Sequence, residues 1–181
     1  SRRSPARGRS AIRWARIFKQ MGHRLDLEQV YDGGACDLMI ALHARRSFDS
    51  IRRFEEKHPE LPLIVVLTGT DLYRDIRIDS NAKQSLELAS RLIVLQSMGL
   101  AELPRRLHAK TRVIYQSAEK VNGRRPLTEN GFFKVCVIGH LRAVKDPLRT
   151  AYAVRDLPKE SRIRVSHLGK AIDPQLRKAA N

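Results

Sequence analysis

The sequence has 181 residues, of which 42% are hydrophobic, and its formal net charge at pH 7 is +16. A chain of this length can bury one hydrophobic core and part of a second. It contains no run of about 18 apolar residues, which excludes a membrane-spanning helix. Its first residues have no apolar core of the signal-peptide kind, so we expect a cytoplasmic protein without a membrane partner.

The positive charge comes from 35 Lys and Arg residues against 19 Asp and Glu residues. These basic residues are spread along the chain, and only residues 1–10 form a basic cluster, which we interpret as a disordered arm. A basic nucleic-acid-binding protein is the alternative interpretation, but the aromatic residues do not alternate with basic runs as they do in a stacking platform. The composition therefore favours an enzyme with an anionic substrate and disfavours nucleic acid as a partner.

Cysteine usage points to a reducing compartment. Cys36 and Cys136 are the two cysteines, and each stands beside an apolar run. Two isolated cysteines do not make a disulfide framework. We therefore expect both to be small buried side chains.

Helical and strand patterns alternate from residue 11 on. An apolar stripe over residues 11–21 predicts an amphipathic helix, and Gly22 is a good stop for it. Apolar and polar residues alternate over residues 24–31, which predicts a strand. Short apolar runs predict four further strands, at residues 38–42, 63–67, 91–95 and 111–115. Further helices are predicted at residues 50–57, 81–89 and 99–107.

Strands that alternate with helices, and that are apolar along their whole length, predict a parallel sheet with helices on both faces. The expected fold class is therefore α/β, with a Rossmann-like N-terminal domain over residues 11–118. Residues 119–130 are polar and contain Gly123 and Pro126, so we interpret them as a linker.

Residues 131–181 begin a second Rossmann-like domain. Strands are expected at residues 132–138 and 163–167, with a helix at residues 147–156 between them and a further helix near the end of the sequence. Two strands are too few for an independent sheet. We therefore expect this domain to be poorly stabilised, with apolar surface exposed at Phe132, Val135, Val137 and Val165.

Ligands of parallel sheets bind beyond the carboxyl ends of the strands, so the segments that follow strands are the candidate sites. The strand at residues 63–67 is followed by Thr68, Gly69, Thr70 and Asp71. The glycine allows close approach of the backbone, and the amides and hydroxyls can hold an anionic or sugar group. The alternative is an ordinary strand-to-helix turn that Thr70 or Asp71 caps.

Two arginines follow the strand at residues 38–42. Arg45 and Arg46 come directly after His43 and Ala44. A guanidinium group matches a phosphate-like anion with two parallel hydrogen bonds, so we predict an anion clamp that includes His43. The alternative is a solvated loop before a capped helix.

A third basic segment follows the strand at residues 132–138. It contains Gly139, His140, Arg142 and Lys145. Gly139 allows a tight exit from the strand, and the basic side chains can bind a diphosphate. A basic surface loop is again the alternative.

Other chemistry has no motif in the sequence. The histidines lack metal-ligand spacing, and neither a nucleophile elbow nor a phosphate-binding Gly-rich Lys-Ser/Thr loop occurs. We therefore expect no metal ion and no cofactor, and no catalytic residue is assigned.

The order of these motifs resembles that of the retaining GT-B-type glycosyltransferases, which use nucleotide sugars. The resemblance covers almost the whole chain from Ala11 on. More closely, three runs resemble the selenosugar synthases of selenoneine biosynthesis; they are Leu-His-Ala-Arg-Arg-Ser at residues 42–47, Thr-Gly-Thr-Asp-Leu-Tyr-Arg-Asp at residues 68–75, and Gly-His-Leu-Arg-Ala-Val-Lys-Asp-Pro at residues 139–147.

This resemblance implies a transferase that joins selenophosphate to the sugar of a UDP-sugar, with UDP-N-acetylglucosamine as the expected donor. His43, Arg45, Arg46 and the turn at residues 68–71 would then bind the acceptor, and the segment at residues 139–145 the donor diphosphate. A glycosyltransferase with another acceptor is an alternative, as is a non-catalytic domain that pairs with a partner subunit. The oligomeric state stays open.

The chain also departs from the family pattern. Many GT-B relatives carry a histidine where this chain has Thr68 and an arginine where it has His140. Because selenophosphate is already anionic, it needs no general base but does need positive charge, which Arg45 and Arg46 can supply. The resemblance further implies that the first strand of the N-terminal domain and most of the nucleotide-sugar domain lie outside these residues, which leaves open whether the chain itself is active.

Overall fold

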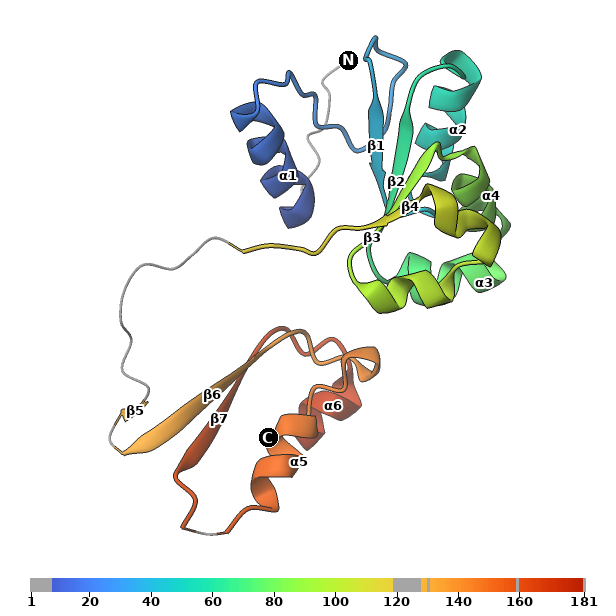
Figure 1. Cartoon of the computed structure of the whole chain (residues 1–181). Coiled ribbons are helices and arrows are strands. Elements are labelled where there is room, and N and C mark those ends of the chain that lie inside the picture. The colour runs from blue at the N-terminus through green and yellow to red at the C-terminus, as the bar shows by residue number, and fades with distance from the viewer. Residues whose placement is uncertain (1–7, 119–127, 130, 159, 181) are drawn as a thin grey trace. The chain divides into compact units, whose positions relative to one another are not determined.

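The computed structural model describes residues 8–118, 128–129, 131–158 and 160–180, and the chain divides into two compact units, Ser1–Ala118 and Glu119–Asn181 (Figure 1). Residues 1–7 of the predicted arm lie outside the described residues. The arm is nevertheless shorter than predicted, because Arg9 and Ser10 already belong to the first helix, α1 (Arg9–Gln20).

The first unit is built on a four-stranded parallel sheet with the order β1-β2-β3-β4. All four predicted strands of this sheet are confirmed; they are β1 (Met39–Leu42), β2 (Leu63–Leu67), β3 (Arg91–Val94) and β4 (Thr111–Val113). Each strand pairs in parallel with the next, as Ala41 with Val65 and Val65 with Leu92. The unit is therefore a mixed α/β structure consistent with a Rossmann-like fold.

Helices α2 (Phe48–Lys57) and α4 (Ser80–Leu88) confirm two further predictions. Figure 1 shows both on one side of the sheet and α1 on the other. Phe54 and Ile51 of α2 are fully buried and belong to the same hydrophobic cluster as Val65 and Leu92 of the strands. Burial on both faces explains why β2 is apolar along its whole length.

Residues 24–31 do not form the predicted strand. Leu27 of this segment instead lines a hollow together with Ile12 and Ala15 of α1. Tyr31 packs edge-on against Phe54, with 5.6 Å between ring centroids, and its backbone N–H donates to the Ser50 hydroxyl. The apolar residues of the segment are thus used by helices, which an alternating pattern cannot distinguish from pairing in a sheet.

The stretch after β3 also differs from the predicted helix at residues 99–107. It consists of two 3₁₀ helices, η2 (Ser97–Glu102) and η3 (Arg105–Lys110). Pro104 separates them, because proline lacks the backbone N–H that a continuous helix needs. The segment after β2 forms a π-helix, η1 (Asp71–Asp75), followed by the short helix α3 (Ile76–Ile78).

The second unit has three described strands, one more than predicted. β6 (Phe132–Ile138) pairs in parallel with β7 (Ile163–Leu168) and antiparallel with β5 (Thr128–Glu129). β5 falls within the predicted linker, of which residues 119–127 and 130 lie outside the described residues. The other elements are η4 (Ala143–Lys145), α5 (Arg149–Arg155) and α6 (Pro174–Ala179).

Burial is shallow in the second unit. Phe132, Val135, Val137 and Val165 are half-buried rather than exposed as predicted. Figure 1 shows α5 and α6 on the same side of β6 and β7. Ile138 is 82% exposed and Leu168 58% exposed.

The prediction of buried cysteines is wrong, because both thiols are free and exposed. Cys36 lies in the irregular segment before β1. Cys136 alternates along β6 with the half-buried Val135 and Val137, so it points to the opposite face of the strand. None of the helices in the described part of the chain has the length and apolar character that a bilayer crossing requires.

Candidate functional site

The carboxyl ends of β1 and β2 are joined by one carboxylate, that of Asp71. This side chain is fully buried and accepts hydrogen bonds from three backbone N–H groups: Ala44 at 3.1 Å, Thr68 at 3.0 Å and Gly69 at 2.8 Å. The first lies in the loop after β1 and the other two in the turn after β2. Two of the predicted segments therefore meet at one point, as expected for neighbouring parallel strands.

His43 occupies a left-handed backbone conformation with a φ of 86°, which is uncommon for a residue other than glycine. Its N–H continues the sheet by donating to the Val66 carbonyl at 3.0 Å, and the residue is 7% exposed. The left-handed turn lets the chain reverse directly after β1. The imidazole is thereby held beside the turn after β2.

Both ring nitrogens of His43 have partners. Nδ1 accepts from the backbone N–H of Arg46 at 3.3 Å, and Nε2 lies 3.2 Å from the Thr70 hydroxyl oxygen. Burial lowers the pKa of His43 below its ordinary value of 6.5; the carboxylate of Asp71 opposes this shift, and Arg46 adds to it. The ring is therefore neutral at neutral pH.

The two predicted arginines have different surroundings. Arg45 Nε lies 3.2 Å from the carboxylate of Asp75, whose side chain is 6% exposed, whereas the Arg45 side chain is 50% exposed. Arg46 is exposed, and no described carboxylate lies within ion-pair distance of its guanidinium group. Arg46 is thus free to bind an anion, while Arg45 must share its charge with Asp75.

Asp75 was missed by the sequence analysis. It stands four residues after Asp71 in η1, and both residues are buried. Short π-helical segments often occur at functional sites. The spacing of two acids by one helical turn directly after a strand is the signal that could have identified Asp75.

A further contact extends this edge of the sheet to β3. The side-chain amide of Gln96, which follows β3, donates to the hydroxyl of Tyr73 in η1. Tyr73 is 44% exposed. Both residues lie in segments that follow strands, which the sequence analysis treats as candidate sites, but it assigns neither of them a role.

The predicted donor segment lies in the second unit and is held by the loop after β7. The Gly139 N–H donates to the Leu168 carbonyl at 2.9 Å, and His140 Nδ1 accepts from the Lys170 N–H at 3.0 Å. The ring of His167 donates from Nε2 to the Gly139 carbonyl at 2.7 Å. The contact between the two loops, His140 with Lys170, was not predicted.

Glycine is needed at the point where the two loops touch. A Cβ atom on Gly169 would lie 1.8 Å from the Gly139 carbonyl oxygen, whereas a Cβ on Gly139 would have open space around it. The side chains of His140, Arg142 and Lys145 are exposed at this edge of the sheet. They form a basic rim that Lys170, also exposed, extends.

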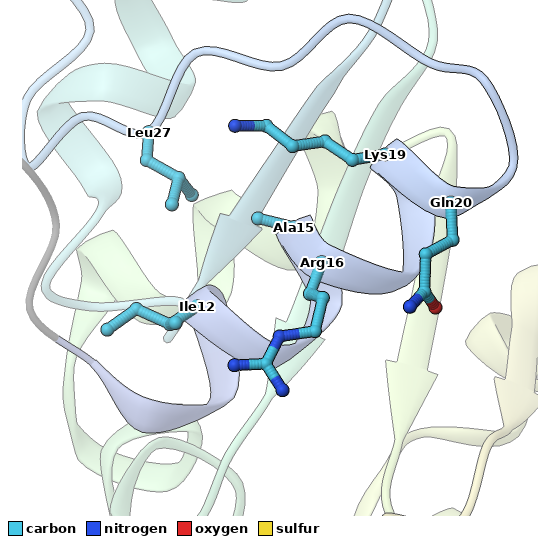
Figure 2. Close-up of a pocket in the computed structure, with 6 residues that line it drawn as sticks. All are labelled: Ile12, Ala15, Arg16, Lys19, Gln20 and Leu27. Carbon is cyan, nitrogen blue, oxygen red and sulfur yellow. The ribbon is translucent and has the colours of Figure 1, made fainter.

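A shallow depression of about 430 Å³ lies at neither of these places. It is on α1, and Ile12, Ala15 and Leu27 are the apolar residues that line it. Figure 2 shows Lys19 extending across it toward Leu27. None of the predicted site residues lines it, and Arg16, Lys19 and Gln20 complete its lining.

No group of three or more His, Cys, Asp or Glu side chains suited to a metal ion occurs among the described residues. The arrangement at β1 and β2 instead offers a cation, a hydroxyl and a neutral imidazole at one edge. No known protein-family model matches the chain, and no curated protein matches its sequence.

Proposed function

We propose that this chain belongs to a glycosyltransferase of the GT-B type, which transfers the sugar of a UDP-sugar to selenophosphate. The observation that carries the proposal is the joined edge of β1 and β2, where Thr70 of the turn held by Asp71 contacts His43, and the backbone N–H of Arg46 contacts the same imidazole. The site lies beyond the carboxyl ends of parallel strands, which is where such sheets bind small anionic ligands.

The acceptor chemistry suits these residues. Selenophosphate carries its charge in the ground state, so binding needs cations and hydrogen-bond donors rather than a general base. Arg46 supplies the free cation, and the space beside Gly69 allows a ligand to approach the backbone, since nothing lies within 4 Å of a Cβ built there. UDP-N-acetylglucosamine is the proposed donor.

The proposed reaction forms one bond and breaks one. A selenium lone pair attacks the anomeric carbon, and the bond from that carbon to the diphosphate oxygen breaks. UDP leaves with the bonding electron pair, and no proton moves in this step. Arg142 and Lys145 of the second unit would stabilise the negative charge on the departing diphosphate.

The experiment incubates the protein with UDP-N-acetylglucosamine and selenophosphate and follows UDP release together with the mass of the selenium-containing sugar. Formation of UDP and of a product with a carbon–selenium bond is the expected result. Inorganic phosphate in place of selenophosphate is the control for simple hydrolysis. If selenophosphate gives no more UDP release than the phosphate control, the proposal is wrong.

The net charge of +16 supports a second candidate, a protein that binds nucleic acid without sequence preference. A salt titration with random-sequence DNA distinguishes the two functions. Binding that persists at physiological salt, with a steep dependence on salt concentration, would favour nucleic acid.

A further inference from the structure

The hydrogen positions on His43 follow from its surroundings. The Arg46 backbone N–H points at Nδ1, so Nδ1 must be the unprotonated acceptor nitrogen of the neutral ring. The ring proton is then on Nε2. From there it reaches the Thr70 hydroxyl oxygen at 3.2 Å, a shorter separation than the 3.9 Å to the Asp75 carboxylate.

This tautomer determines what the Thr70 hydroxyl can do. A hydroxyl has one hydrogen to donate, and its oxygen has lone pairs to accept with. Because the oxygen already accepts from His43, the hydroxyl hydrogen is directed away from the imidazole. Thr70 is exposed, and no acceptor for its hydrogen is found among the described residues.

We propose that the Thr70 hydroxyl is a hydrogen-bond donor to an oxyanion ligand, and that His43 is the positioning residue that orients it. The ligand is an anion with a phosphate-like oxygen, because Arg46 lies on the same loop as His43 and has no described carboxylate partner. The identity of this ligand as the acceptor rests on the proposed function, but the donor role of Thr70 does not.

The arrangement also predicts selectivity. The hydrogen of Thr70 is available, whereas one of the two lone pairs on its oxygen already accepts from His43, so the site favours an acceptor oxygen over a ligand group that must itself donate. A donor that is already oriented costs less to bind than one that rotates freely. His43 therefore contributes to affinity without touching the ligand.

The experiment is calorimetric titration of the whole chain with inorganic phosphate at pH 8, where His43 is neutral. Thr70→Val keeps the shape and removes the hydroxyl, and we expect it to weaken phosphate binding roughly tenfold, as loss of a hydrogen bond to a charged group does. Thr70→Ser keeps the donor and should stay within about twofold of the wild type. Ser97→Ala, an exposed hydroxyl after β3, is the matched control and should change nothing.

The role of His43 is tested with His43→Asn in a double-mutant cycle. Asparagine tolerates the left-handed backbone and retains an acceptor near the position of Nδ1, but it has no group that reaches Thr70. We expect His43→Asn to weaken phosphate binding about threefold in the wild-type background and to have no further effect in the Thr70→Val background. A merely structural role for His43 would give the same loss in both backgrounds.

Three results would overturn the inference: phosphate binding by Thr70→Val at wild-type strength, an equal effect of His43→Asn in both backgrounds, or no phosphate binding by the wild-type chain. Because the titration contains no UDP-sugar, its result does not depend on whether the protein transfers a sugar. Phosphate binding that depends on Thr70, in a protein that consumes no UDP-sugar, would reject the proposed transferase and keep the donor role.

Discussion

The Asp71 carboxylate lies 3.1 Å from the backbone nitrogen of Ala44 and so joins the loop after β1 to the turn after β2. We predict that Asp71→Asn lowers the free energy of unfolding by about 2–3 kcal/mol, because the amide group of asparagine would face buried N–H donors that then lack an acceptor. Urea denaturation measures the change. Asp79→Asn is the control, since Asp79 caps α4 and asparagine caps a helix as well as aspartate does. Equal stability losses in the two variants would contradict the assignment.

Stability should depend on pH through His43. Its pKa is lowered by burial in the folded protein, so the unfolded chain takes up the proton first as the pH falls. The free energy of unfolding should therefore decrease as the pH drops below the ordinary histidine value of 6.5 toward the lower folded pKa. Urea midpoints at several pH values should fall more steeply for the wild type than for His43→Asn. Parallel curves for the two proteins would show that His43 does not titrate in this way.

Asp75 should limit anion affinity. Its carboxylate forms an ion pair with Arg45, with 3.2 Å to Arg45 Nε, and adds a negative charge beside the proposed anion site. We expect Asp75→Asn to tighten phosphate binding several-fold, since removing a nearby like charge is worth about 1 kcal/mol at a partly solvated site. Calorimetry measures the affinity at low and high salt, because the gain should shrink with ionic strength. Glu102→Gln, which breaks the exposed ion pair with Arg77, is the control with no expected change.

The contact between Gly169 and Gly139 allows a test of the second unit. Gly169→Ala should destabilise this unit by roughly 1–3 kcal/mol, because the new methyl group has no room beside the Gly139 carbonyl. Gly139→Ala has open space and is the matched control. Two-dimensional NMR spectra of the two variants should show shifts spreading through residues 139–145 only for Gly169→Ala. The same spectrum for both would mean that the loops do not touch.

Hydrogen exchange should separate the two units. Val65 in β2 is fully buried between β1 and β3, whereas Val135 in β6 is only half-buried. We expect peptides from β6 and β7 to exchange faster than peptides from β2, because opening them exposes less apolar surface. Mass spectrometry of exchanged and digested protein gives the rates. Equal protection of β2 and β6 would contradict this expectation.

The sequence predicted those parts of the fold that depend on local pattern. Continuous apolar runs located β1 to β4, since a strand buried on both faces needs apolar residues throughout. The prediction of a strand at residues 24–31 was wrong, because alternation of apolar and polar residues does not reveal whether a neighbouring strand exists. Leu27 lines a hollow beside α1, and Tyr31 packs against Phe54 of α2, so neither residue needs a neighbouring strand.

For the candidate site, the sequence predicted which segments meet but not which individual side chains contact one another. Parallel pairing implied that the residues after β1 and β2 meet, and the structure brings His43 and Thr70 within 3.2 Å. The left-handed conformation of His43 and the pairing of Arg45 with Asp75 depend on tertiary contacts between segments about 30 residues apart. No local pattern encodes such contacts, so the sequence analysis assigned both arginines the same role.

The two exposed cysteines have a practical consequence. Cys36 belongs to the first unit and Cys136 to the second, and the sequence contains no other cysteine. Thiol-reactive dyes would therefore label each unit once, without any substitution. Energy transfer between the two dyes would report directly on movement between the units when a UDP-sugar is added.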